Sequence, residues 1–317
     1  MTLDLIVEEP SEFLLDVLAG LQDAEKSIDP KWLYDEIGSA LFEEITMLPE
    51  YYLTRTETQI LKDHAGTLAG LVPEGGALVE FGSGASVKTR TLLSAGGHIG
   101  TYVPMDISEV FLHETALDLR QRYPGIAIRP VVGDFLNPIA LPRDLASTPK
   151  VGFFPGSTLG NIAPSSARQL LAGARAWPGI EAFVLGVDLV KDPFVLEAAY
   201  DDAAGVTQKF ITNILRRLNR EFGATFDPQH FDYEAKWNVG MARIEMSLIS
   251  KGAHVAALGD HPIVFEAGEK IEISKSRKYT PASIEKTARD SGWRVDTLLT
   301  DHDELFAIAV LKPADGA

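Results

Sequence analysis

Residues 77–90, with the sequence ALVEFGSGASVKTR, decide the fold that this chain can adopt. The first five residues form a short, mostly apolar run, which is typical of a buried strand. Gly82 and Gly84 then flank Ser83, and glycine allows the backbone to adopt positive φ angles and to approach a ligand closely. A helix is expected to begin near Val87. A strand that passes through a glycine turn into a helix predicts the first unit of a nucleotide-binding α/β fold.

Downstream of this stretch, short apolar runs alternate with helix-like segments as far as residue 190. The runs include TYVPMDI, AIRPVVGDF, VGFFPGS and AFVLGVDL, and the segments between them include SEVFLHETALDLRQRY and SSARQLLAGARAW. Alternation of this kind is the signature of βαβ units, whose right-handed crossovers build a parallel sheet covered on both faces. We therefore predict an α/β, Rossmann-like domain with a mostly parallel sheet.

The regions outside this alternation differ in character. Residues 1–55 read mainly as helices, and the segment after residue 190 is a long helical region followed by strand-like pieces such as FDYEAKWN and RIEMSLIS. This mixture is typical of an α+β domain. The last part of the chain reads as a helix and two strands that can complete the earlier sheet. We predict one α/β domain from residues 56–190 and 280–317, and a second, α+β domain from residues 1–55 and 191–279.

The composition excludes several classes of partner and site. The 317 residues carry a formal net charge of −16, so the chain repels phosphate backbones and nucleic acid is not an expected partner. The absence of cysteine excludes disulfides and thiolate metal sites, and we predict no metal. No segment reaches the roughly 18 apolar residues of a membrane span, and the first residues lack the basic start of a signal peptide. We expect a monomeric, cytoplasmic protein with no membrane partner.

The residues around the glycine turn distinguish two nucleotide ligands. A dinucleotide site requires a third small residue three positions after Gly84, and this position is Val87. Glu80 stands just before the turn, where an acid suits a ligand that carries an ammonium group and no pyrophosphate. These features favour S-adenosylmethionine over a nicotinamide dinucleotide. Lys88 is then placed to meet the carboxylate of S-adenosylmethionine.

Two further strand ends supply candidate contacts for the same ligand. Asp106 ends the run TYVPMD, where an acid can accept hydrogen bonds from ribose hydroxyls. Asp134 can accept from the adenine amine, and Phe135 can cover the ring. An Asp after a strand often only caps a helix, but three strand ends in register favour a binding site. The predicted S-adenosylmethionine-binding residues are Glu80, Gly82, Gly84, Lys88, Asp106, Asp134 and Phe135.

The loop after the fourth strand carries another group of small and polar residues. The sequence VGFFPGSTLGNIAP contains Gly156, Gly160 and Asn161, whose carbonyls and amide can orient an amine. The alternative is a glycine-rich loop in which Asn161 caps a helix before Pro164. From the pattern alone, this second interpretation is the commoner one.

The stretch KIEISKSRKYT, which begins at Lys270, alternates with a period of two. As a strand it places Ile271 and Ile273 on one face, and Glu272 and Ser274 on the other. By pattern alone the polar face is most simply a solvated one. The alternative is a carboxylate and a hydroxyl that together recognise a ligand.

Eight segments of the chain resemble the histidine Nα-methyltransferases of ergothioneine biosynthesis. They extend from the second helical segment to about residue 280, and their length and unusual sequence make the resemblance specific for this family. One departure is Leu53, where relatives are expected to have Pro. The segments are KWLYDEIGSALFEEITMLPEYYLTRTETQIL, VEFGSGASVKTR, GSTLGN, DLVKD, AYDDAAGVT, AKWN, RIEM and IEISKSRKY.

The resemblance implies a class I methyltransferase domain that holds S-adenosylmethionine, and an amino-acid substrate bound between the two domains. It implies transfer of three methyl groups to the α-amine of L-histidine, which gives hercynine and releases S-adenosylhomocysteine. It also implies that Asn161 and Tyr200 hold the amino-acid end of the substrate, and that Glu272 and Ser274 bind the imidazole. The implied substrate-binding residues are Tyr34, Tyr51, Asn161, Tyr200, Met246, Glu272 and Ser274, with Tyr51 preferred to Tyr52.

Two alternatives to histidine methylation remain open from the sequence. One is Nα-methylation of another aromatic amino acid such as tryptophan, although an indole has no second nitrogen to satisfy a buried carboxylate at Glu272. The other is a non-catalytic S-adenosylmethionine-fold binding protein, which the intact donor-binding set disfavours. No residue is assigned as catalytic, because a tyrosine hydroxyl, a main-chain carbonyl or water can accept the amine proton.

Overall fold

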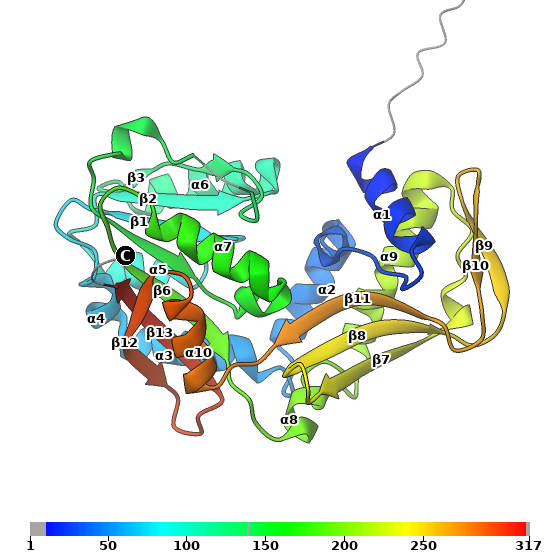
Figure 1. Ribbon diagram of the computed structural model, residues 1–317. Helices are drawn as coiled ribbons and strands as arrows, with labels where there is room; N and C mark the ends of the chain where they lie inside the picture. The colour runs from blue at the N-terminus through cyan, green and yellow to red at the C-terminus, as the bar shows by residue number, and fades with distance from the viewer. Residues whose placement is uncertain (1–10, 138–139, 315–317) are drawn as a thin grey trace, which may run out of the picture. The chain divides into compact units, whose positions relative to one another are not determined.

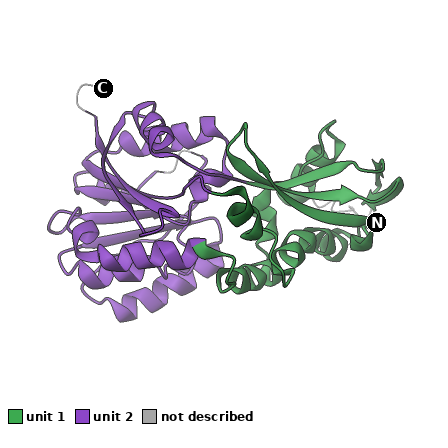
Figure 2. Ribbon diagram, turned by 90° about the horizontal axis from the view of Figure 1, so that it is seen from below, with its two compact units in different colours: residues 1–52, 192–275 green, residues 53–191, 276–317 purple. Residues whose placement is uncertain are grey.

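The computed structural model (Figure 1) describes residues 11–137 and 140–314. The chain divides into two compact units, coloured separately in Figure 2. Unit 1 comprises Met1–Tyr52 and Asp192–Lys275, and unit 2 comprises Leu53–Lys191 and Ser276–Ala317. We expected the chain to change domain after residues 55, 190 and 279, and the two units change after residues 52, 191 and 275.

Unit 2 is built on one large sheet with the order β12-β13-β6-β5-β1-β2-β3, in which β4 also pairs with β2. The strands between β1 and β6 pair in parallel, whereas β13 is antiparallel to both of its neighbours. The last two strands, β12 and β13, complete the sheet as predicted, and α10 precedes them in the chain. The strands are β1 (Ala77–Phe81), β2 (Thr101–Asp106), β3 (Ala127–Ile128), β4 (Val131–Val132), β5 (Lys150–Phe154), β6 (Ile180–Asp188), β12 (Trp293–Thr300) and β13 (Phe306–Pro313).

Helices cover both faces of this sheet. Leu170 of α7 and Ile284 of α10 pack into an apolar core with Val79 and Phe81 of β1. Glu80 points to the opposite face because side chains alternate along a strand, and there it contacts Thr89 of α5. The helices of unit 2 are α3 (Tyr52–Asp63), α4 (Ala65–Ala69), α5 (Thr89–Ala95), α6 (Glu109–Arg122), α7 (Pro164–Arg175) and α10 (Pro281–Arg289), with short 3₁₀ turns at Arg143–Leu145 and Thr158–Asn161.

The order of the strands creates a switch point between β1 and β5. From β1 the chain proceeds outward through β2 to β3, whereas β5 and β6 extend in the other direction (Figure 1). In open parallel sheets, ligands bind beyond the carboxyl ends of the strands at such a point. The glycine turn after β1 and the loop after β5 therefore lie side by side at the expected place.

A buried charge cluster lies where the chain leaves and re-enters unit 2. Asp188, at the end of β6, is fully buried, and its two carboxylate oxygens lie 2.6 Å from Lys191 Nζ and 2.7 Å from Lys278 Nζ. The backbone N–H of Tyr279 donates to the carbonyl of Asp188 at 2.8 Å, and that of Val190 donates to the carbonyl of Tyr279 at 2.9 Å. Buried charges need such partners. The Asp188 carboxylate thus links the segment that leaves unit 2, through Lys191, to the segment that re-enters it, through Lys278.

Unit 1 has the expected α+β character. Its three-stranded sheet has the order β11-β8-β7, and β9 and β10 form a separate antiparallel pair. Its strands are β7 (Phe231–Asn238), β8 (Arg243–Ser250), β9 (His254–Leu258), β10 (His261–Phe265) and β11 (Lys270–Arg277), the last of which continues into unit 2. Its helices are α1 (Glu12–Gln22), α2 (Glu36–Thr46), α8 (Pro193–Ala198) and α9 (Val206–Phe222), with 3₁₀ turns at Pro30–Leu33 and Pro228–His230.

Acidic side chains bind the first N–H groups of two helices in unit 1, α2 and α9. Asp202 accepts from the N–H groups of Val206 and Thr207, which satisfies the free donors at the start of α9. Asp35 caps α2 and also accepts from Asn213 and Arg220 of α9. The cap of one helix is therefore a contact that joins the two helices.

Two local predictions differ from the structure. The helix expected near Val87 begins at Thr89, because the loop continues through Ser86, whose φ is 51°. The run AIRPVVGDF forms two short strands rather than one, since Pro130 has no N–H to donate to a ladder. In the part of the chain that the structure describes, no helix is long and apolar enough to cross a membrane.

A methyl group added at Gly152 should destabilise unit 2. A Cβ at this position in β5 would lie 2.3 Å from the buried ring of Phe183. We expect Gly152→Ala to lower the free energy of unfolding by about 1–3 kcal/mol through overpacking. Urea denaturation followed by circular dichroism measures this change.

Gly173→Ala is the matched control for this substitution. A Cβ at Gly173, in α7, would meet no atom within 4 Å, so alanine should stabilise the helix by about 0.5–1 kcal/mol. Equal urea midpoints for the two variants would show that the packing around Gly152 is not tight.

Candidate functional site

The glycine turn after β1 is fixed to the end of β2. Gly82 and Gly84 have φ angles of 60° and 47°, which favour glycine. The Gly84 N–H donates to Asp106 Oδ2 at 2.9 Å, and the Ser83 N–H donates to the Met105 carbonyl at 3.0 Å. Asp106, predicted as a ribose contact, thus also shapes the turn.

Phe135 lies beside this turn. Its ring packs edge-to-face against Phe81 and Phe154, and a Cβ at Gly82 would lie 3.5 Å from Phe135 Cε1. Asp134 accepts from the Leu136 N–H at 2.8 Å, which closes the loop after β4. The structure therefore brings the predicted residues of three strand ends to one edge of the sheet.

Glu80 lies beneath the turn and is 1% exposed. Its Oε2 accepts from the hydroxyls of Thr89, at 2.5 Å, and Tyr102. Ser86 Oγ in turn lies 2.9 Å from the Tyr102 hydroxyl. Burial raises the pKa of Glu80 to about 8, because a low-dielectric environment disfavours the charged form. Its contact with a bound ligand remains a prediction.

Lys88 forms an ion pair that the sequence did not reveal. Its Nζ lies 2.5 Å from Oε2 of Glu57, in α3, and the Lys88 side chain is 21% exposed. The two carboxylate oxygens of Glu57 also accept from the N–H of Gly156, at 2.8 and 2.9 Å. One carboxylate therefore connects the loop after β1 with the loop after β5.

The sequence contains a signal for the burial of Glu57. It occupies the position between Leu53 and Ile60 on the face of α3 that is otherwise apolar and buried. An acid at a core position of an amphipathic helix requires a buried partner. Helical periodicity locates such an acid, but it does not identify the partner.

The site fits S-adenosylmethionine. Ser83 Oγ is buried and has no hydrogen-bond partner within the described residues, so the turn holds a polar atom for a ligand to satisfy. A Cβ built at Gly84 would meet no atom within 4 Å, which leaves the outer side of the turn open. These features suit a polar ligand that approaches the backbone.

The loop after β5 holds Asn161 at the end of a 3₁₀ turn. Gly156 and Ser157 have positive φ angles of 81° and 57°, and Ser157 Oγ accepts from the N–H of Asp188 at 2.9 Å. A Cβ at Gly160 would lie 2.5 Å from the carbonyl oxygen of Arg277, so only glycine fits there. Asn161 is exposed.

Aromatic side chains gather in unit 1. Tyr51 lies 6.0 Å from Tyr200 and 6.3 Å from Phe42, between ring centroids. Tyr34 lies 5.6 Å from Phe42 and 5.5 Å from Phe210. We call these five residues the aromatic cluster. It joins three predicted substrate residues to Phe42 and Phe210, which were not predicted.

The remaining predicted residues lie on neighbouring strands of the unit 1 sheet. Met246, in β8, is buried, and Glu272 and Ser274 lie in β11. The carboxylate of Glu272 pairs with Lys275, and both side chains are 35% exposed. Ser274 is 9% exposed. Part of the Glu272 side chain is therefore exposed to solvent, whereas Ser274 is largely buried.

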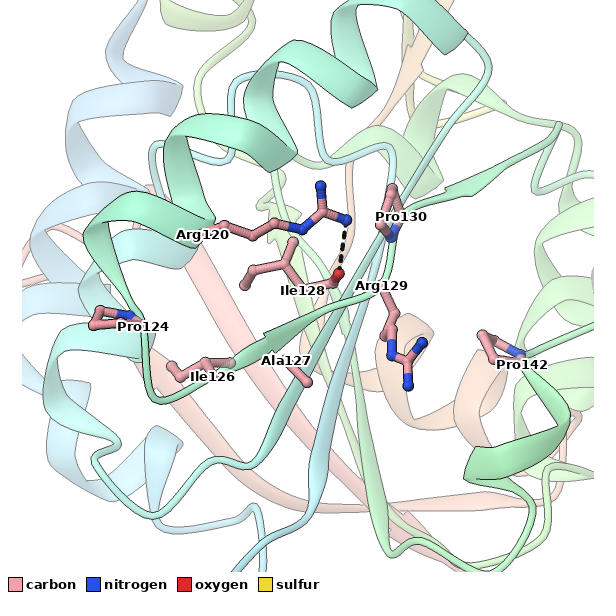
Figure 3. A pocket seen from close by; sticks show the side chains of 8 residues that line it. All are labelled: Arg120, Pro124, Ile126, Ala127, Ile128, Arg129, Pro130 and Pro142. Carbon is pink, nitrogen blue, oxygen red and sulfur yellow. Dashed lines mark hydrogen bonds between the residues drawn. The ribbon is translucent and has the colours of Figure 1, made fainter.

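An open pocket of about 600 Å³ lies elsewhere in unit 2 (Figure 3). Ala127 and Ile128 in its wall pair with Thr101 and Tyr102, at the amino end of β2. This end is opposite to the edge where ligands bind in parallel sheets. Its lining contains no predicted site residue: Arg120, Pro124, Ile126, Ala127, Ile128, Arg129, Pro130 and Pro142.

The fold and the site together define a class of protein. A mainly parallel sheet with β13 reversed, a glycine turn after β1 and an acid at the end of β2 characterise a class I, S-adenosylmethionine-dependent methyltransferase. The family of histidine-specific, S-adenosylmethionine-dependent methyltransferases matches residues 13–313. The chain belongs to this family.

Curated relatives support this assignment. The chain is 42% identical over 309 residues to the histidine N-alpha-methyltransferase of Mycolicibacterium smegmatis, with 93% of each chain covered. It is 41% identical over 281 residues to the enzyme of the same name from Mycobacterium tuberculosis, with 85% of each covered. Ergothioneine biosynthesis protein 1 of Neurospora crassa is 33% identical over 214 residues, which are 64% of this chain and 24% of that protein.

The raised pKa of Glu80 predicts a pH-dependent effect of Glu80→Gln. The ordinary value is 4.5 and the folded value is about 8, so stabilisation by the protonated acid is complete below pH 4.5 and is lost as the pH rises towards 8. Relative to wild type, the free energy of unfolding of Glu80→Gln should therefore increase by up to about 1.4 kcal/mol per pH unit over this interval. Urea unfolding of both proteins between pH 5 and about pH 8 tests this.

Glu234→Gln is the control for this titration. The pKa of Glu234 is lowered by its hydrogen bond to Lys270, so its stabilisation is lost only as the pH falls below 4.5. The difference in the free energy of unfolding between Glu234→Gln and wild type should stay constant over the same pH interval. A flat difference for Glu80→Gln as well would contradict a buried, protonated Glu80.

Proposed function

We propose that this protein is the enzyme that trimethylates the α-amino group of L-histidine to give hercynine, a step of ergothioneine biosynthesis. The match over 93% of each chain to a histidine N-alpha-methyltransferase is the observation that carries the proposal. The glycine turn of unit 2 and the acids beside it support the proposal, because they suit the methyl donor. The expectations of a monomeric, cytoplasmic enzyme without nucleic-acid or membrane partners remain predictions.

The chemistry requires orientation more than it requires a strong base. S-adenosylmethionine supplies a methyl group already activated on a sulfonium, and S-adenosylhomocysteine leaves when the amine takes the methyl. The chain must hold a neutral amine in line with this methyl group. No catalytic residue is assigned. A tyrosine hydroxyl, a main-chain carbonyl or water accepts the proton that the amine releases.

The proposed donor set lies within unit 2. Gly82 and Gly84 allow the ligand to approach the backbone, and Asp106 can accept from ribose hydroxyls. Lys88 is proposed to form a hydrogen bond to the carboxylate of S-adenosylmethionine. It would do so through ammonium hydrogens that are not bonded to Glu57. Glu80, Asp134 and Phe135 complete the proposed set.

The aromatic cluster suits the charge of the product. Each methylated amine is a cation, and an aromatic face stabilises a cation by about 0.5–2 kcal/mol. We assign this role to Tyr34 and Tyr51. Tyr51 is favoured over Tyr52 because its ring contacts Tyr200. Asn161 and Tyr200 are proposed to hold the amino-acid end of the substrate.

The side-chain specificity is assigned to Glu272, Ser274 and Met246. A carboxylate can accept from one imidazole N–H, and a hydroxyl can donate to or accept from the other ring nitrogen. Met246 supplies an apolar wall. An indole offers only one N–H, so tryptophan methylation is the weaker alternative. A protein that binds the donor without turnover is the other alternative.

Mass spectrometry tests the proposed reaction. The purified protein is incubated with S-adenosylmethionine and, in separate reactions, with each of the twenty amino acids. We expect histidine alone to gain three methyl groups, about 42 Da by mass arithmetic, with formation of S-adenosylhomocysteine. Trimethylated tryptophan would favour the first alternative. Donor binding without any methylated amino acid would favour the second.

Glu272→Ala should damage histidine use far more than donor binding. Loss of the carboxylate leaves one imidazole N–H unsatisfied, so kcat/KM for histidine should fall at least about tenfold. The dissociation constant of S-adenosylhomocysteine, measured by calorimetry, should change by less than about twofold.

Glu234→Ala is the matched control for this substitution. Glu234 is also an acid in the sheet of unit 1 and pairs with Lys236 and Lys270. It should leave both constants unchanged. Equal losses of histidine use and donor binding in Glu272→Ala would contradict a specific role of Glu272 in imidazole recognition. β11 would then be an ordinary amphipathic strand.

A further inference from the structure

Glu57 is a buried acid that the donor and substrate sets do not include. It is 0% exposed, and a buried carboxylate is costly unless charged or polar donors surround it. Its partners are Lys88 Nζ, at 2.5 Å, and the N–H of Gly156, at 2.8 and 2.9 Å. Both partners belong to loops at the binding edge of the sheet.

The structure makes room for this carboxylate. A Cβ at Gly186, in β6, would lie 2.1 Å from Glu57 Oε1 and 3.3 Å from the Gly156 nitrogen. A side chain at Gly186 would therefore occupy the position of the carboxylate. The glycine in the middle of a strand marks a close approach of another group, and this group is Glu57.

The two partners of Glu57 also lie beside each other. A Cβ at Gly156 would lie 3.4 Å from Lys88 Nζ. Lys88 is the proposed contact of the donor carboxylate, and Gly156 begins the loop that carries Asn161. Glu57 thus sets the position of the lysine relative to the backbone of the substrate loop.

We propose that Glu57 is a positioning residue that couples the donor-binding loop to the substrate-binding loop. It acts on the ligands through Lys88 and Gly156 and does not touch the reacting atoms. Charge fixes the direction of the Lys88 ammonium, and the two-oxygen contact fixes the Gly156 amide. The effect on histidine rests on the proposed function, whereas the effect on donor binding does not.

Glu57→Gln tests this proposal because it keeps the shape and removes the charge. We expect the dissociation constant of S-adenosylhomocysteine, measured by calorimetry, to rise about tenfold. KM for both substrates should rise, and Glu57→Asp should recover part of the loss. Gly186→Ala should reproduce the weakening, since the added Cβ displaces the carboxylate. Asp296→Asn, in an exposed pair with Arg294 on β12, is the control and should match wild type.

A double-mutant cycle separates positioning from general destabilisation. If the effect of Glu57 on donor binding acts through Lys88, adding Glu57→Gln to Lys88→Gln should change S-adenosylhomocysteine affinity by less than about twofold. The double variant leaves no unpaired buried charge, so it should fold even where a single variant is destabilised. Thermal unfolding of each variant confirms that the comparison is between folded proteins.

Two outcomes would overturn the proposal. One is wild-type affinity of folded Glu57→Gln for S-adenosylhomocysteine, and the other is a fully additive cycle. Because S-adenosylhomocysteine binding needs no amino acid, this readout is independent of the histidine reaction. A non-additive cycle for S-adenosylhomocysteine binding, in a protein that forms no hercynine, would support the role of Glu57 and refute the proposed function.

Discussion

The need to provide hydrogen-bond partners for two buried acids organises the edge of the unit 2 sheet at the carboxyl ends of its parallel strands. Glu57 and Glu80 both lie on the face of the sheet opposite to α7 and α10, and neither is solvated. Glu57 takes its donors from a lysine and a backbone amide of two loops. Glu80 takes its donors from Thr89 and Tyr102, beneath the glycine turn. An unpaired buried acid is costly, so these bonds hold the loops at the carboxyl ends of β1 and β5 in one arrangement.

The residues of unit 1 contribute a different kind of surface. The aromatic cluster combines large apolar rings with tyrosine hydroxyls, a composition that suits an aromatic amino acid and a methylated cation. Asp35 and Asp202 bind the first N–H groups of α2 and α9, the helices that carry Phe42 and Phe210. The two units therefore differ in chemistry. Unit 2 presents backbone groups, acids and Lys88, and unit 1 presents aromatic rings and the strand that carries Glu272.

Several features were predictable because their signals are local. The alternation of strands and helices in unit 2 and the α+β character of unit 1 both depend on neighbouring residues. The acid at the end of β2 was also placed correctly beside the turn. By contrast, the sequence did not reveal the hydroxyl groups of Thr89 and Tyr102 that bond to Glu80. The pattern indicates that an acid stands at a strand end but not which donors it meets.

The sequence by itself determined the α/β class, the order of the elements and the methyltransferase family, because periodicity, turn residues and long motifs are written along the chain. Only the tertiary structure decided which groups meet. Glu57 stands 99 residues from Gly156, and the partners of Asp188 lie on both sides of the inserted segment. Such pairings depend on how strands align in the sheet and on which buried charges find donors. No local pattern encodes them, since the partners become neighbours only after the chain has folded.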